Sequence, residues 1–188
     1  MVENAITFDE RSKATIADEM RDLTDIDNPN SVSQMKSWLS DQWIEVESLG
    51  KKAIAEMIKD APEDLAQILS LCQQLTKSSV KKYQAMQNAA CIDHLTRGMF
   101  QFYGANRTGR WTGRLIQLQN LPQNHMDDLD AARELVRIGD YDSLSMLYDD
   151  IPDTLSQLIR TAFISKPGYK FYEADFSAIE ARVIAHLA

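Results

Sequence analysis

The sequence predicts a mainly α protein with a small α+β part. Apolar residues recur at helical spacing in several segments before residue 98, and candidate helix caps precede them. Glycines cluster only between Gly98 and Gly113, where turn signals replace the helical pattern. Close to the C-terminus, a short alternating run precedes another helical pattern, which is typical of a strand that leads into a helix.

The first helices are predicted from caps and from apolar spacing. Residues 5–25 are rich in charge and are compatible with either a helix or a connector. Residues 28–31 combine a turn with a cap, and Gln34 lies three residues after Ser31, which favours a helix from this point. The apolar face expected for this helix consists of Val32, Met35, Trp38 and Leu39.

Two more helices are expected before the glycine cluster. Asp60 and Pro62 favour a helix start, because proline is common in the first helical turn, and Ser78 or Ser79 starts the next helix. We expect these helices to pack together through their apolar stripes. The stripes are Leu65, Ile68, Leu69, Cys72 and Leu75 in the first helix, and Val80, Tyr83, Met86 and Ala90 in the second.

Charge is segregated along a chain whose net charge is -8. The stretch from Lys77 to Arg114 holds seven cations and one acid, a local net charge of +6. The stretch from Asp127 to Asp153 holds nine carboxylates and two arginines, and residues 123–159 are interpreted as a solvated helical insertion. Because phosphate contacts are local and are screened within about 10 Å, the basic stretch is compatible with a nucleic-acid partner despite the negative total.

Composition indicates a globular chain of 188 residues, 44% of them hydrophobic, which suits one large or two small domains. Cys72 and Cys91 match neither a disulfide framework nor a zinc signature, so buried reduced thiols and a cytoplasmic location are expected. The N-terminus lacks the pattern of a signal peptide, and no run of about 18 apolar residues occurs, so no membrane partner is expected.

Histidine and tryptophan give few functional signals. The histidines lack partners at metal-ligand spacing and are interpreted as structural: His94, His125 and His186. Trp38 and Trp43 follow a helical apolar pattern and are expected in the core. Trp111 lies in the basic stretch and is the tryptophan placed to stack on bases.

The C-terminal residues combine two carboxylates with a strand-to-helix pattern. Residues 169–174 are expected to form a strand that ends at Asp175. Ser177 and Glu180 have the spacing of a capping box, which predicts a helix start. A carboxylate at a strand end, beside a helix N-terminus, can hold a divalent cation with open positions for phosphate, an arrangement that suits phosphoryl transfer. The apolar residues at helical spacing are Ile179, Val183, Ile184 and Leu187.

Residues 175–188, Asp-Phe-Ser-Ala-Ile-Glu-Ala-Arg-Val-Ile-Ala-His-Leu-Ala, resemble the first catalytic motif of family A (DNA polymerase I type) DNA polymerases. Ala178 departs from the glutamine that the family often has. The resemblance implies that Asp175 and the backbone carbonyl of Phe176 bind a metal. It also implies that Glu180 excludes a sugar 2′-hydroxyl and that Arg182 supports the site or contacts the primer end. The alternative for Glu180 is the capping box alone, worth about 1 kcal/mol.

Two earlier segments carry the same resemblance, to the phage or prophage-like branch of the family. Residues 76–83 resemble a thumb helix that follows the duplex backbone, which implies phosphate contacts by its lysines. Residues 108–122 resemble the Thr-Gly-Arg and Leu-Gln-Asn motifs that contact the minor-groove side of the primer-template. The alternatives are a solvated lysine face and turns with surface arginines. The implied DNA contacts are Lys77, Lys81, Lys82, Arg107, Arg110, Arg114, Gln119 and Asn120.

The resemblance also implies a domain plan: a helical thumb followed by an incomplete palm. An N-terminal connector would span residues 1–30 and the thumb residues 31–103. The partial palm would span residues 104–188 and include the acidic helical insertion at about 123–159.

The function implied is template-directed DNA synthesis by two-metal nucleotidyl transfer, with Mg²⁺ as cofactor and primer-template DNA and dNTPs as partners. The family's second catalytic aspartate and its fingers helix have no counterpart in the sequence. We therefore expect a fragment of a larger polymerase that binds primer-template duplex and is inactive alone. The alternatives are a non-catalytic DNA-binding module and a helical protein-interaction domain; nothing in the sequence indicates an oligomeric state.

Overall fold

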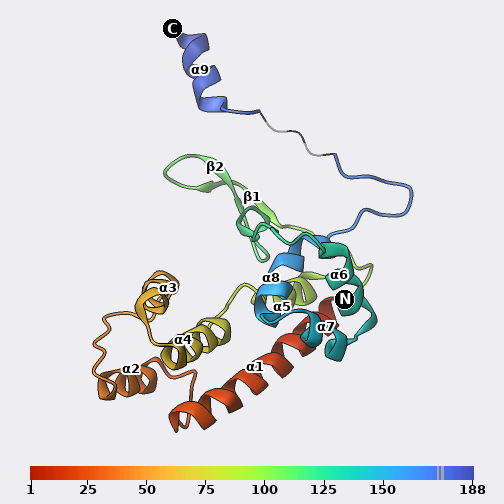
Figure 1. Cartoon of the computed structure of the whole chain (residues 1–188). Coiled ribbons are helices and arrows are strands. Elements are labelled where there is room, and N and C mark those ends of the chain that lie inside the picture. Colours follow the sequence, from red (N-terminus) through yellow and green to blue (C-terminus); the bar gives the residue numbers. More distant parts are fainter. Residues whose placement is uncertain (173, 175) are drawn as a thin grey trace.

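The computed structural model describes residues 1–172, 174 and 176–188. A body of packed helices carries a β-hairpin, and a C-terminal helix lies at the end of an extended segment (Figure 1). The chain is mainly α with a small two-stranded sheet, which confirms the predicted fold class. The helices of the body are α1 (Val2–Thr24), α2 (Val32–Asp41), α3 (Lys51–Asp60), α4 (Glu63–Leu75), α5 (Lys81–Ala89), α6 (Leu129–Ile138), α7 (Tyr141–Leu147) and α8 (Ile151–Leu158). The remaining elements are β1 (Phe100–Ala105), β2 (Arg110–Gly113), the 3-10 helices η1 (Leu118–Asn120) and η2 (Ile159–Ala162), and α9 (Ile179–Leu187).

Helix α1 is the long element that connects two hydrophobic cores. It packs against α4, α5, α6 and α8, so residues 5–25 form a helix, one of the two alternatives that the sequence left open. Phe8 lies in one core and Met20 in the other. One core comprises Ala5, Phe8, Val80, Tyr83, Met86, Met99, Ile116, Leu121, Ala132, Val136, Leu144, Ile151, Leu155, Leu158 and Ile159. The other comprises Ile16, Ala17, Met20, Ile26, Met35, Leu39, Ile54, Ile68, Leu69, Leu71, Cys72 and Leu75.

Most of the predicted features of α2 and α4 are present. Ser31 caps α2, and its hydroxyl accepts a hydrogen bond from the Gln34 backbone N–H at 3.4 Å. Met35 is buried, whereas Val32 is 54% exposed at the first helical position, so its assignment to the core face was wrong. Helix α3 was not predicted and lies between these two helices in the chain. The buried residues of α4 are Ile68, Leu69, Leu71, Cys72 and Leu75.

Helix α5 follows the predicted apolar spacing. Tyr83 is fully buried, and its hydroxyl donates a hydrogen bond to the Leu155 carbonyl at 2.8 Å. Burial raises the pKa of this phenol above its ordinary range. Ala90 is exposed, contrary to the prediction, because the helix ends at Ala89.

The acidic region is helical, as predicted, but it is not a solvated insertion. Helix α8 packs against α1, α4 and α6, and its apolar side is buried in the core with Leu155 and Leu158 fully covered. Asp150 caps α8 by accepting a hydrogen bond from the Asp153 backbone N–H at 2.7 Å. Acidic residues therefore coexist with a buried face, because helical spacing separates them from the apolar residues.

The hairpin joins β1 and β2 in an antiparallel pair. Its register pairs Phe100 with Gly113 and shifts before Ala105 pairs with Arg110. At Gly104 a Cβ would overlap the Thr112 side chain across the sheet, so the close approach of the strands requires glycine there. The sequence predicted a turn-rich segment here and missed the two strands.

The C-terminal region differs from its prediction. Residues 169–172 and 174 form no strand, because they have no pairing partner among the described residues. The capping box is wrong as well: Ala178, with a φ of 52°, precedes α9, and no side chain caps this helix. The described residues from Lys166 to Ala188 are all exposed.

Two single residues also correct the sequence analysis. Cys72 is buried and reduced as expected, whereas Cys91 is reduced but exposed in a turn. Trp38 packs partly against a core, whereas Trp43 is 96% exposed and was wrongly assigned to one. None of the helices that the structure describes has the length and apolar character needed to cross a membrane.

Candidate nucleic-acid interface

The hairpin presents arginines to solvent from a defined backbone. Arg107 lies in the turn, Arg110 begins β2, and Arg114 follows it; all three are exposed. The Arg114 backbone N–H donates to the Met99 carbonyl at 2.7 Å, so its main chain is anchored to the other strand while its guanidinium faces solvent. Exposed guanidinium groups held on a strand pair can bind phosphate oxygens.

Aromatic side chains accompany these arginines. Phe102 on β1 and Trp111 on β2 meet edge to face with ring centroids 5.3 Å apart, and Tyr103 lies beside Phe102. Phe102 is 70% exposed and Trp111 63% exposed. Aromatic faces next to cations are typical of surfaces that stack on nucleic-acid bases. Trp111 is exposed, and its stacking on bases stays a prediction.

The short 3-10 helix η1 that follows the hairpin carries Gln119 and Asn120, and Gln119 lies five residues after Arg114. Both residues belong to η1 and are exposed. A Cβ at Gly113 would overlap the Gln119 side-chain amide, so this glycine leaves the space in which the Gln119 side chain lies against the end of β2. The Asn120 side-chain amide donates to the Gln117 side-chain oxygen at 3.4 Å.

Two of the selected lysines have partners within the protein. Lys77 forms an ion pair with Asp153, and the Lys82 ammonium donates to the Ile116 carbonyl at 2.7 Å. Lys81 is exposed on the wall of a cavity of about 530 Å³ between α1 and α5. DNA contacts by Lys77 and Lys82 stay predictions, and each would compete with an internal bond.

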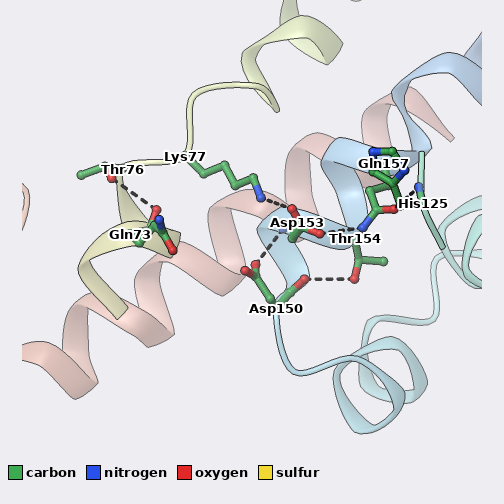
Figure 2. A network of polar contacts seen from close by, with 8 residues as sticks. All are labelled: Gln73, Thr76, Lys77, His125, Asp150, Asp153, Thr154 and Gln157. Atoms are coloured by element: carbon green, nitrogen blue, oxygen red, sulfur yellow. Dashed lines mark hydrogen bonds and ion pairs between the residues drawn. The ribbon is translucent and has the colours of Figure 1, made fainter. Parts of the chain in front are cut away.

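A polar network surrounds the Lys77 ion pair (Figure 2). The other Asp153 oxygen accepts from the Gln157 amide at 2.6 Å, and Gln157 accepts from the His125 backbone N–H at 2.8 Å. Burial raises the pKa of Asp153, but the hydrogen bonds from Lys77 and Gln157 outweigh it, so the net pKa lies below its ordinary value. Burial raises the pKa of the neighbouring Asp150. The network connects the α4–α5 junction to α8 and to the segment before α6.

The basic stretch contains one more internal pair. Arg97 binds Asp93 with nitrogen–oxygen distances of 2.9 and 2.5 Å across an exposed turn. The hydrogen bond from Arg97 holds the pKa of the Asp93 carboxyl well below its usual range. Some of the positive charge of the stretch is thus neutralised locally, and the exposed positive charge is concentrated on the hairpin.

The terminal motif is only partly described. Asp175, the predicted metal ligand, lies outside the described residues. Phe176 and Glu180 are exposed, and the Arg182 guanidinium donates to the Ser177 carbonyl at 2.8 Å. Arg110 lies 3.9 Å from the Glu180 carboxylate, so the structure places residues of the two predicted motifs near each other. No cluster of three acids, histidines or cysteines suited to a cation occurs within the described residues.

The chain is similar to DNA polymerases. It is 51% identical, over 189 aligned positions that cover all of this chain, to a DNA polymerase of Bacillus phage SP02. It is also 67% identical over 30 residues, 16% of the chain, to DNA polymerase I of Rhizobium leguminosarum. No protein-family model and no solved structure matches the chain. These comparisons confirm the resemblance to phage-type and DNA polymerase I type proteins.

The chain spans 29% of the length of the phage polymerase. Its match to the Rhizobium protein covers 3% of that protein's length. The sequence had indicated the arginines of the hairpin and the Gln-Asn pair. It gave no indication of the internal partners of Lys77 and Lys82, because those partners lie 76 and 34 residues away in the chain.

Proposed function

We propose that this chain is the part of a DNA polymerase that holds primer-template DNA during template-directed synthesis. The observation that carries the proposal is the hairpin, with its exposed arginines and aromatic rings, together with the Gln119 side chain that lies against Gly113 at the end of β2. The similarity to a phage DNA polymerase along the whole chain supports it.

The hairpin and the turn after it would contribute different contacts. Arg107 and Arg110 suit phosphate oxygens, which fix the position of the duplex without reading its sequence. Arg114, Gln119 and Asn120 present donors that suit minor-groove acceptors, which occupy similar places in every base pair. Such contacts favour correctly paired ends of any sequence, which is what copying a template requires.

The chemical step would involve the terminal motif in the complete enzyme. Asp175 and the backbone carbonyl of Phe176 would hold Mg²⁺, which supplies activation of the primer hydroxyl and stabilisation of the leaving pyrophosphate. Glu180 would limit space at the sugar 2′ position of the incoming dNTP. Its carboxylate is exposed and caps no helix, and that role would compete with its ion pair to Arg110. Arg182 would support the turn at Ser177 before the helix.

The domain plan of a thumb followed by a partial palm remains part of this proposal. The two hydrophobic cores do not coincide with a boundary at residue 103, because Val80, Tyr83 and Met86 share a core with residues beyond it. We expect the 188-residue chain to bind duplex without extending primers, since the family's second catalytic aspartate and its fingers helix have no counterpart in the sequence. Primer extension with Mg²⁺ and all four dNTPs measures this directly.

The test of the binding role compares two DNA substrates by fluorescence anisotropy. Arg114→Ala should weaken binding to a primer-template junction roughly tenfold and to blunt duplex less, because its proposed contact lies at the primer end. Arg137→Ala, which removes a cation paired with Glu134 on α6, is the matched control. Equal losses for both substrates, or binding that is indifferent to salt, would contradict the proposal.

The catalytic role is tested in a complete polymerase that carries this segment. Asp175→Asn should reduce the chemical step by several orders of magnitude with duplex binding retained. Glu180→Ala should raise ribonucleotide incorporation relative to deoxynucleotide incorporation. A polymerase that tolerates Asp175→Asn would make this segment a non-catalytic DNA-binding module.

A further inference from the structure

The segment that carries Gln119 and Asn120 is bound, directly after Asn120, by one side chain of the helical body. Arg160, in η2 directly after α8, donates from Nε to the Pro122 carbonyl at 2.8 Å and from Nη2 to the Leu121 carbonyl at 3.0 Å. We propose that Arg160 is a positioning residue, which holds the Gln119–Asn120 turn in the orientation that meets the primer-template. This inference rests on the proposed function.

Further contacts complete the attachment of this segment. On its near side, the Lys82 ammonium binds the Ile116 carbonyl at 2.7 Å. On its far side, the Gln157 side chain accepts from the His125 backbone N–H at 2.8 Å. Ile116 and Leu121 are buried in the core. Residues 117–120, between the buried Ile116 and Leu121, are therefore a short bridge with fixed ends. Arg160 binds the carbonyls of the two residues that directly follow this bridge.

The backbone is in an unfavourable conformation on both sides of Ile116, where the bridge begins. Leu115 and Gln117 have φ values of 53° and 55°, in the left-handed region that residues with a Cβ seldom adopt. Such conformations persist where the surrounding structure determines them, and they are frequent at functional sites. Loss of an anchoring side chain should let this bridge relax toward more favourable conformations, which would displace the exposed Gln119 and Asn120.

Arginine suits the position for a geometric reason. Its planar guanidinium presents donors in a fixed fork, and here two of them reach two successive carbonyls. A lysine has the same charge but a single ammonium group on a flexible stem, so it would bind these carbonyls with less defined geometry. Arg160→Lys thus separates the effect of the fork from the effect of the charge.

The position of Arg160 gives the acidic region a role in the proposed interface. The Lys77–Asp153–Gln157–His125 network fixes α8 to the α4–α5 junction and to the segment after the bridge (Figure 2). Arg160 follows α8 along the same continuous helical stretch. Helix α8 is therefore the support from which Gln157 and Arg160 together hold residues 121–125.

The positional half of the inference is tested without DNA, by hydrogen–deuterium exchange of the 188-residue chain. Arg160→Ala should increase exchange in peptides that cover residues 116–125 and leave α4 unchanged, and Arg160→Lys should give a smaller increase. Arg137→Ala is the control, because it also removes one exposed cation from the same region. Unchanged exchange at residues 116–125 in both Arg160 variants would overturn the inference.

The functional half is tested by anisotropy on a primer-template. Arg160→Ala should weaken binding roughly three- to tenfold, the range that loss of one or two hydrogen bonds produces. In a Gln119→Ala/Asn120→Ala background the same substitution should have no further effect, since Arg160 acts through that pair. A full additional loss in that background would overturn the inference, because it would make Arg160 an independent phosphate contact.

The exchange and anisotropy experiments together distinguish a failure of this inference from a failure of the proposed function. If the wild-type chain fails to bind any duplex, the proposed function fails and the role of Arg160 at a DNA interface fails with it. If the wild-type chain binds and neither Arg160 variant changes exchange or affinity, the inference alone fails. If Arg160→Ala lowers the melting temperature of the whole chain, the comparison of Arg160→Lys with wild type still tests the inference, because this variant keeps the charge and changes only the donor geometry.

Discussion

The helical body and the hairpin contain the same kinds of side chain, but they use them differently. In the body, Lys77 and Lys82 bind internal acceptors, and Tyr83 is fully buried. In the hairpin, Arg107 and Trp111 are exposed. The comparison teaches that position relative to the cores, and not residue type, decides which cations and aromatic rings are available for a partner.

The same contrast applies to stability. Each core is built from elements far apart in the sequence, whereas the hairpin is a two-stranded sheet that exposes most of its aromatic surface. A two-stranded hairpin alone is marginally stable in water. Exposed apolar groups gathered on such an element mark an interaction surface, which agrees with the role proposed for it.

The largest difference between the two regions should appear in the stability of core variants. Leu155→Ala should reduce the free energy of unfolding by about 2–5 kcal/mol, because Leu155 is fully buried on α8. Phe102→Ala in the hairpin should cost less than about 1 kcal/mol. Urea unfolding followed by circular dichroism measures both. A small effect of Leu155→Ala would instead support the interpretation of the acidic region as a solvated insertion.

A smaller effect is expected at the ion pair that connects the α4–α5 junction to α8. Lys77→Met should lower the free energy of unfolding by about 1–2 kcal/mol at pH 7, because it removes a charged hydrogen bond to Asp153. The estimate is at the low end because Asp153 is 40% exposed and therefore partly screened. Lys81→Met, at an exposed position four residues along the chain, should have little effect.

The Lys77 effect should depend on pH. The pKa of Asp153 is lowered in the folded state, so its contribution is complete above the unfolded pKa of about 4 and is lost as pH falls through the folded pKa. The difference in melting temperature between wild type and Lys77→Met should thus be largest near neutral pH and shrink in acid below pH 4. A difference that stays constant from pH 7 to pH 2 would show that the ion pair contributes nothing.

The smallest stability effect is expected at the C-terminal helix. Ser177→Ala should change the free energy of unfolding by no more than about 0.5 kcal/mol, because Ser177 caps no helix. Ser31→Ala is the matched comparison in the body and should cost about 1 kcal/mol, because that hydroxyl caps α2. Equal decreases in the free energy of unfolding for the two substitutions would indicate that Ser177 caps α9 after all.

Local sequence patterns predicted helices α2, α4 and α5 well. The Ser31 cap and the apolar stripe of α5 depend on residues within a few positions of each other, and both are present. The motif of arginine, glutamine and asparagine was also visible, because it is contiguous in the sequence. The structure adds that Gly113 leaves room for Gln119 beside Arg114.

The remaining features depend on contacts that local patterns do not contain. Nothing near Lys77 in the sequence points to Asp153, and nothing near Asn120 points to Arg160. The expected strand at residues 169–174 needs a pairing partner, and residues 169–172 and 174 have none among the described residues. Alternation alone is therefore not sufficient to predict a strand here.

The salt dependence of primer-template binding tests the central claim most directly. Two double variants of the 188-residue chain each remove two cations: Arg107→Ala/Arg110→Ala in the hairpin and Lys77→Ala/Lys82→Ala in the body. The slope of log K against log salt should decrease in magnitude by up to about 2 for the hairpin variant, since each lost phosphate contact removes roughly 0.9. It should remain at the wild-type value for the body variant, whose folding is checked by circular dichroism. Equal slopes for the two variants, or a larger decrease for the body variant, would contradict the assignment of DNA binding to the hairpin.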